Sequence, residues 1–112
     1  MLDSSSELFG SPNRTRVLIT IRLLGETWAS ELAAMLGLRL FSVQTILASL
    51  ERDAVIVTRT LGRTRQVMLN PRYFANAELD ALLWKLGERD VSLQKALASR
   101  RRRPRRTGKA LS

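Results

Sequence analysis

Residues 30–50 read SELAAMLGLRLFSVQTILASL, and this stretch decides the fold. Its first part, residues 30–37, is a short alanine-rich run that ends in glycine, which is typical of a helix of about two turns. In the second part, Val43, Leu47 and Leu50 recur at the spacing of one helix face. Two helices joined by a glycine-containing turn make a helix-turn-helix unit.

The residues before this unit predict a further helix over 12–24. Ser11-Pro12 combines a good N-cap residue with proline at the first helical position, where the missing N–H costs nothing. Gly25 supplies a C-terminal stop. Apolar residues recur between them at helical spacing: Val17, Leu18, Ile21 and Leu24.

After the unit the hydrophobic period changes from helix to strand. Val55, Val57, Val67 and Leu69 alternate with more polar residues in two runs, separated by a glycine-centred turn at residues 61–63. A two-stranded ribbon directly after a helix-turn-helix is a wing. The sequence therefore predicts a wing over 55–69, and residues 40–52 become the recognition helix.

The segment beyond the wing predicts one or two C-terminal helices. We expect Asn76 to cap the first helix, Gly87 to interrupt it, and a second helix to start at Asp90. These helices offer a dimer interface, or the first stripe closes the monomer core. The apolar residues concerned are Leu79, Leu82, Leu83, Leu86, Val91, Leu93 and Leu97. The predicted fold is mainly α with a small β-hairpin, a winged helix-turn-helix domain over residues 8–99.

The charge of the chain is concentrated at its C-terminal end. The 112 residues contain 19 Lys+Arg against 10 Asp+Glu, a formal charge of +9. Residues 100–112 contain no acid, and their like charges predict a disordered basic tail that binds nucleic acid without sequence preference, or one that only aids solubility. The cations of this tail are Arg100, Arg101, Arg102, Arg103, Arg105, Arg106 and Lys109.

Composition excludes several kinds of chemistry. The chain has no cysteine and no histidine, so thiolate and imidazole metal sites and histidine bases are absent. It also lacks a glycine-rich phosphate loop and a close pair of carboxylates, and we expect neither an enzyme nor a cofactor. The N-terminus is acidic and polar, and no run approaches about 18 apolar residues, so we expect a cytoplasmic protein with no membrane partner.

The order of elements resembles the winged helix-turn-helix of the ArsR and MarR repressor superfamily. Over residues 8–86 the chain is most similar to the ArsR-like winged domains fused to, or encoded beside, small nucleotidyltransferases. The residues that carry this resemblance are Leu8-Phe9-Gly10-Ser11, Glu31-Leu32-Ala33, Gly37-Leu38, Val43-Gln44, Leu47 through Leu50-Glu51, and Leu69-Asn70-Pro71. Metal sensing does not carry over, because its cysteine and histidine ligands are missing.

Two positions depart from this resemblance. Arg39 stands where a small polar residue usually precedes the recognition helix, which leaves Ser42 as the nearest capping candidate. Ala54 stands where a glycine commonly ends that helix, so the exit is either less tightly turned or strained.

In this architecture the recognition helix enters the major groove of DNA. Gln44 is suited to adenine, Arg39 to guanine or phosphate, and Thr45 to a hydrogen bond or a thymine methyl group. The full set of candidates on the helix is Arg39, Ser42, Gln44, Thr45 and Ser49. The alternative is that these are ordinary solvated helix residues.

Two further groups are candidate contacts to the DNA backbone. Arg59, Arg63 and Arg65 on the wing suit phosphates or the minor groove, although a charged hairpin also protects an edge strand. The second group lies near helix N-termini, where anions bind, or serves only capping and solubility: Arg14, Arg16, Thr27 and Ser30.

Four large apolar side chains are assigned to packing. We expect Leu40 and Phe41 to pack against helix 12–24, and Trp28 and Trp84 to lie in the core or an interface. Duplex DNA offers the tryptophans no open base on which to stack.

The sequence thus predicts a double-stranded DNA-binding transcriptional regulator, a repressor that binds as a homodimer. Two other functions stay open. One is a protein-interaction module, an adaptor or antitoxin-like partner that binds nucleic acid only non-specifically. The other is RNA binding, for which exposed aromatic residues are typical; this chain has few aromatic residues.

Overall fold

The structure, a computed structural model, describes residues 8–102. Within this range the chain forms five helices and one antiparallel hairpin, which confirms the predicted fold class. The elements are α1 (Pro12–Leu24), α2 (Ala29–Leu36), α3 (Leu40–Arg52), β1 (Ile56–Leu61), β2 (Thr64–Leu69), α4 (Asn76–Glu88) and α5 (Val91–Arg102).

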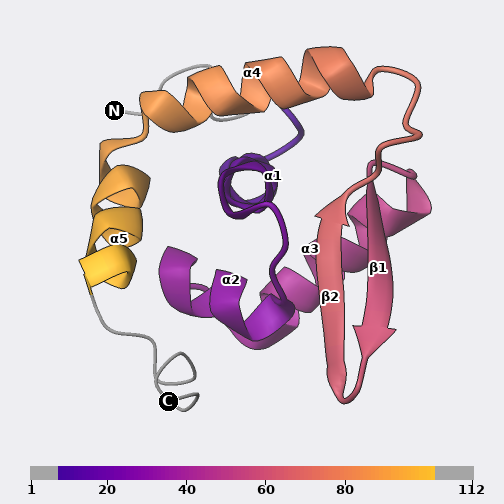
Figure 1. Cartoon of the computed structure of the whole chain (residues 1–112), viewed down its shortest axis with the longest axis horizontal. Helices are drawn as coiled ribbons and strands as arrows, with labels where there is room; N and C mark the ends of the chain where they lie inside the picture. Colours follow the sequence, from indigo (N-terminus) through magenta and orange to yellow (C-terminus); the bar gives the residue numbers. More distant parts are fainter. Residues whose placement is uncertain (1–7, 103–112) are drawn as a thin grey trace.

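Helix α1 passes through the middle of the molecule, and the other elements surround it (Figure 1). Its start and end agree with the prediction: the Ser11 hydroxyl accepts the Arg14 N–H at 3.1 Å, and Gly25 follows Leu24 with φ of 82°. Val17 and Ile21 are fully buried. The core therefore forms around this helix rather than between two separate layers.

The helix-turn-helix unit forms as the spacing predicts. Gly37 adopts the left-handed conformation at the end of α2, where a side chain would be strained. Val43, Leu47 and Leu50 are all buried, and they form the inner face of α3. This buried face determines which side of α3 is left toward solvent.

The two ends of α3 differ from expectation in their capping. Arg39 occupies the N-cap position with no capping bond from its side chain, so Ser42 does not cap the helix as expected. At the exit, Ala54 has φ of 64°, which selects the strained alternative. The Asn70 side-chain amide donates to the Ala54 carbonyl at 2.9 Å and holds this turn.

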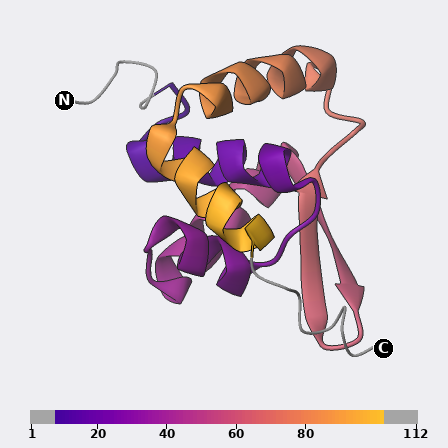
Figure 2. The same cartoon turned by 60° about the vertical axis from the view of Figure 1, so that its left-hand side comes forward.

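Backbone hydrogen bonds anchor the hairpin to the loop before α2. β1 and β2 pair from Ile56↔Leu69 to Leu61↔Thr64. Thr27, in the loop before α2, bridges to Val67 of β2 by backbone hydrogen bonds of 3.0 and 2.7 Å. The base of the wing is thereby fixed, while its tip extends away from α4 (Figures 1 and 2).

Helix α4 packs closely against α1 at Gly87, which has no side chain. A Cβ at Gly87 would lie 3.0 Å from Leu23 Cδ1 and 3.2 Å from Ile19 Cγ2. The expectation that Gly87 interrupts the helix is wrong, because α4 continues to Glu88 and uses the missing side chain for close packing. Asn76 is also not the cap; Ala75 occupies that position without a side-chain bond.

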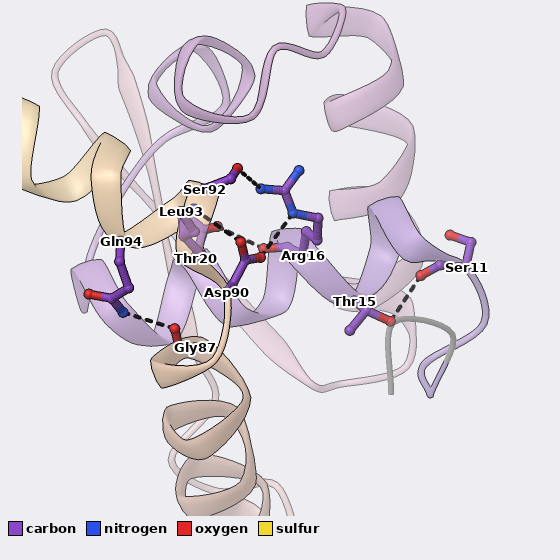
Figure 3. Close-up of polar contacts among 9 residues, drawn as sticks. All are labelled: Ser11, Thr15, Arg16, Thr20, Gly87, Asp90, Ser92, Leu93 and Gln94. Carbon is purple, nitrogen blue, oxygen red and sulfur yellow. Dashed lines mark hydrogen bonds and ion pairs between the residues drawn. The ribbon is translucent and has the colours of Figure 1, made fainter. Parts of the chain in front are cut away.

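The start of α5 is tied to α1 by polar contacts (Figure 3). The Asp90 carboxylate accepts the Leu93 N–H at 3.0 Å, which caps α5, and it also accepts the Arg16 Nε–H at 3.1 Å. The Gln94 side chain donates to the Gly87 carbonyl at 2.9 Å. The predicted start of this helix at Asp90 is therefore close to the observed one.

Most residues assigned to a dimer interface instead close the core of a single chain. Leu79, Leu83, Leu93 and Leu97 are buried, and Leu86 is half-buried. Only Leu82 and Val91 of that set are exposed. The apolar stripe of α4 thus follows the alternative in which it completes the monomer.

The two tryptophans do not enter the core. Trp28 is 40% exposed and Trp84 is 45% exposed. The Arg22 guanidinium lies 4.8 Å from the centre of the Trp84 ring, a cation–π contact that covers one face of the ring. Arg22 also pairs with Asp80 of α4.

The folded domain extends past residue 99. α5 continues to Arg102, so residues 100–102 are helical and not part of a disordered tail. The Arg100 Nε–H donates to the Glu31 carboxylate at 2.9 Å, which joins α5 to α2. The remaining cations of the predicted tail, Arg103, Arg105, Arg106 and Lys109, lie outside the described residues.

Candidate nucleic-acid interface

The outer face of α3 carries a continuous row of exposed residues. They follow helical spacing on the side opposite Val43, Leu47 and Leu50, and none of them is acidic. We call this set the α3 stripe: Phe41, Gln44, Thr45 and Ala48.

Two predicted reading residues, Gln44 and Thr45, lie in this stripe. Both are exposed. The Thr45 hydroxyl donates to the Phe41 carbonyl at 3.0 Å, so its proton is used within the helix. The methyl group of this exposed side chain makes no hydrogen bond and is left for contact with a partner. The Gln44 amide has no protein partner among the described residues and retains its full hydrogen-bonding capacity.

The first turn of α3 exposes the apolar residues that were expected to pack. Phe41 is 76% exposed and Leu40 is 45% exposed. The expectation is wrong because the N-terminal end of α1 meets the opposite end of α3, where Arg14 contacts Ser49 and Asp53. The first turn of α3 lies beyond the reach of α1.

Two predicted serines do not belong to the stripe. Ser49 is half-buried and its hydroxyl accepts a hydrogen bond of 2.6 Å from Arg14, so it points toward α1. Ser42 is also half-buried, one position beyond Phe41. Helical spacing alone places these residues beside the stripe, and only the crossing of α1 decides which way Ser49 points.

The three wing arginines occupy different environments. Arg63 lies at the exposed tip beside Gly62, with no partner in the described part of the chain. Arg59 donates to the neutral Gln66 side chain at 2.8 Å and keeps its net charge. Arg65 is paired with Glu51 of α3 at 3.2 Å.

The Glu51–Arg65 pair was not predicted, and it links the wing to the last turn of α3. Glu51 also accepts the Thr58 hydroxyl at 2.9 Å, and Arg65 donates to the same hydroxyl oxygen at 3.1 Å. The three side chains form one network between α3 and both strands. No short-range sequence signal identifies this contact, because it spans 14 residues.

Of the candidates near helix N-termini, only Ser30 stays exposed without a side-chain bond in the range 8–102. Thr27 is fully buried and donates to Glu31 at 2.7 Å, which is incompatible with the predicted phosphate contact of its side chain. Arg14 is paired with Asp53 at 3.0 Å, and Arg16 with Asp90. Both arginines hold elements together.

Unpaired positive charge flanks the α3 stripe. Arg39 directly precedes α3, Arg52 ends it, and Arg63 lies at the wing tip; within the described range none has an anionic partner. The acids at the end of α3, Glu51 and Asp53, are both neutralised by arginines. The surface around the stripe therefore has a positive balance suited to a polyanion.

Other kinds of site find little support in the described residues. No cluster of three or more metal-ligating side chains occurs in residues 8–102. None of the helices in that range is long and apolar enough to cross a membrane.

Helix α1, the α2–α3 unit and the hairpin define a winged helix-turn-helix protein. The chain superposes on the crystal structure of a mutant MarR from E. coli with a TM-score of 0.58 and 20% sequence identity. The match covers 84% of this chain and 68% of the MarR chain, and it shows a common fold. Neither a protein-family profile nor a curated protein sequence matches the chain.

Proposed function

We propose that this protein is a transcriptional regulator that binds double-stranded DNA sequence-specifically and has no enzymatic role. The observation that carries the proposal is the α3 stripe on a MarR-like fold. This exposed and acid-free face is flanked by three arginines that have no anionic partner within residues 8–102. An α-helix about 10–12 Å across fits a major groove about 12 Å wide.

The residues divide into base contacts and backbone contacts. Gln44 pairs with adenine, and Arg39 reaches guanine or phosphate at the start of α3. Arg63 and Arg59 neutralise phosphates beside the wing, which fixes the register of the helix without reading sequence. Arg65 positions the wing through Glu51 instead of contacting DNA.

We further propose that the protein acts as a homodimer and as a repressor. One recognition helix covers a short half-site, which is too little for discrimination within a genome, and two-fold dimers double the reading length. Exposed Leu82 and Val91, together with half-exposed Trp84, offer apolar surface for such an interface. The repressor role rests on the resemblance to the ArsR and MarR superfamily.

One observation favours a second candidate, a protein-interaction module. Phe41 and Leu40 form an exposed apolar tip, where packing against α1 was expected. A partner protein docked there would leave only non-specific nucleic-acid binding.

A salt-titrated binding assay tests the proposal with the DNA upstream of the protein's own coding sequence and a scrambled duplex. The variants are Gln44→Ala/Thr45→Ala and Arg63→Ala, with Lys85→Ala as the matched loss of one charge on α4. A sequence-reading regulator is supported if the wild type prefers the natural duplex and Gln44→Ala/Thr45→Ala loses this preference. Arg63→Ala is then expected to lower the affinity for both duplexes. Equal and weak binding of both duplexes by the wild type refutes it.

A further inference from the structure

Contact with phosphates uses charged and polar side chains, but the α3 stripe also exposes apolar groups. Phe41 is the large apolar residue of the stripe, and it is 76% exposed. Ala48 presents only a methyl group. An apolar side chain left in water contributes no hydrophobic stabilisation, so its exposure at the start of a charged face indicates an apolar group on the partner.

Thr45 adds to this apolar character. Its hydroxyl proton is already donated to the Phe41 carbonyl, so the side chain can accept a hydrogen bond but has no free donor. Besides this acceptor oxygen, Thr45 offers a partner only its methyl group. Among the central residues of the stripe, only Gln44 brings both a free donor and a free acceptor.

The length of this part of the stripe is enough to reach a few neighbouring base pairs. From Phe41 to Ala48 the helix rises about 10 Å at 1.5 Å per residue. Base pairs stack about 3.4 Å apart, so this part of the stripe covers about three of them. Of the four bases only thymine presents an apolar group, its C5-methyl, in the major groove, and adenine on the paired strand presents the pattern that an amide side chain recognises.

We propose that the α3 stripe recognises an A·T-rich half-site, in which Phe41, Thr45 and Ala48 contact thymine methyl groups while Gln44 pairs with adenine. The proposal rests on the DNA-binding function proposed above and assigns its base preference. It also gives a role to Phe41, which packing within the monomer does not explain.

The surrounding charge favours DNA over a protein as the apolar partner. Arg39, Arg52 and Arg63 are unpaired within residues 8–102 and border the stripe, so the partner presents an apolar spot surrounded by negative charge. A thymine methyl group between two rows of phosphates has this arrangement.

The experiment starts from a random duplex library, from which the full-length protein selects its binding site. Each thymine of the selected site is then replaced by deoxyuridine, which lacks only the methyl group, and affinities are measured for wild type and Phe41→Ala. Phe74→Ala is the matched control, because Phe74 is 91% exposed and lies outside α3. Unfolding midpoints of both variants confirm that the fold is kept.

We expect uracil to weaken wild-type binding by about fourfold for each contacted methyl group, the factor that corresponds to one buried methylene. At one position Phe41→Ala abolishes the difference between thymine and uracil, while Phe74→Ala preserves it. The proposal is overturned if no replacement of thymine by uracil changes the affinity. It is also overturned if the losses of affinity caused by Phe41→Ala and by uracil multiply independently at every position. Either result leaves the DNA-binding function standing. A library that yields no selected site overturns both and favours the protein-interaction module.

Discussion

Replacing Ala54 with glycine is expected to stabilise the protein, although glycine substitutions usually do the opposite. Ala54 links α3 to the wing with φ of 64°, and a left-handed conformation costs a non-glycine residue about 1–2 kcal/mol. Its side chain is exposed, so little packing is lost when the Cβ is removed. Glycine also makes the unfolded chain more flexible, which offsets about 0.4–1 kcal/mol. The net expectation is about 0.5–1 kcal/mol of added stability.

Urea unfolding followed by circular dichroism measures this gain, and thermal unfolding is expected to shift upward by about 2–8 °C. The matched control is Ala81→Gly on the exposed side of α4, where the same substitution costs about 1 kcal/mol because the backbone there is helical. If Ala54→Gly destabilises the protein as much as Ala81→Gly does, the inference that Ala54 is strained is refuted.

Three further predictions concern the packing and the charged end of the chain. Gly87→Val is expected to destabilise the domain by about 1–3 kcal/mol, measured by urea unfolding, because the new side chain overlaps α1; an unchanged midpoint would contradict this. Glu31→Ala removes the largely buried acceptor of both Arg100 and Thr27 and is expected to cost about 1.5–3 kcal/mol, whereas exposed Glu78→Ala costs less than about 0.5 kcal/mol. Equal losses would contradict the role of the Glu31 carboxylate in joining these groups. A chain that ends at Arg102 keeps the folded domain but loses four cations, so the slope of log affinity against log salt concentration is expected to become less steep by as much as about 3.6. A slope that does not change would exclude contact of these cations with DNA.

The sequence predicts the helices and the wing well because their signals are local. The Ser11-Pro12 start of α1 and the buried spacing of Val43, Leu47 and Leu50 depend on residues less than two turns apart. Gln44 and Thr45 follow directly, since a helix with one buried face exposes the other. The fold and the centre of the candidate site are therefore accessible from periodicity alone.

Several of the incorrect expectations depend on contacts between elements distant in sequence. Ser49 is turned inward by Arg14, 35 residues earlier in the chain. Thr27 is buried by its bridge to Val67 on the wing. Gly87 has the local signature of a helix breaker, and only the crossing with α1 shows that it permits close packing. Local spacing does not contain the angle at which two helices cross.

The close approach at Gly87 has a consequence for how this chain can diverge over evolution. Ile19, Leu23 and Gly87 share one space between α1 and α4, so these three positions do not vary independently. A descendant with a larger residue at position 87 preserves the crossing most easily when the side chain at position 19 or 23 shifts or becomes smaller. We therefore expect homologues with this helix arrangement to show correlated substitutions at these three positions. Winged proteins that place the C-terminal helix differently are not expected to show them.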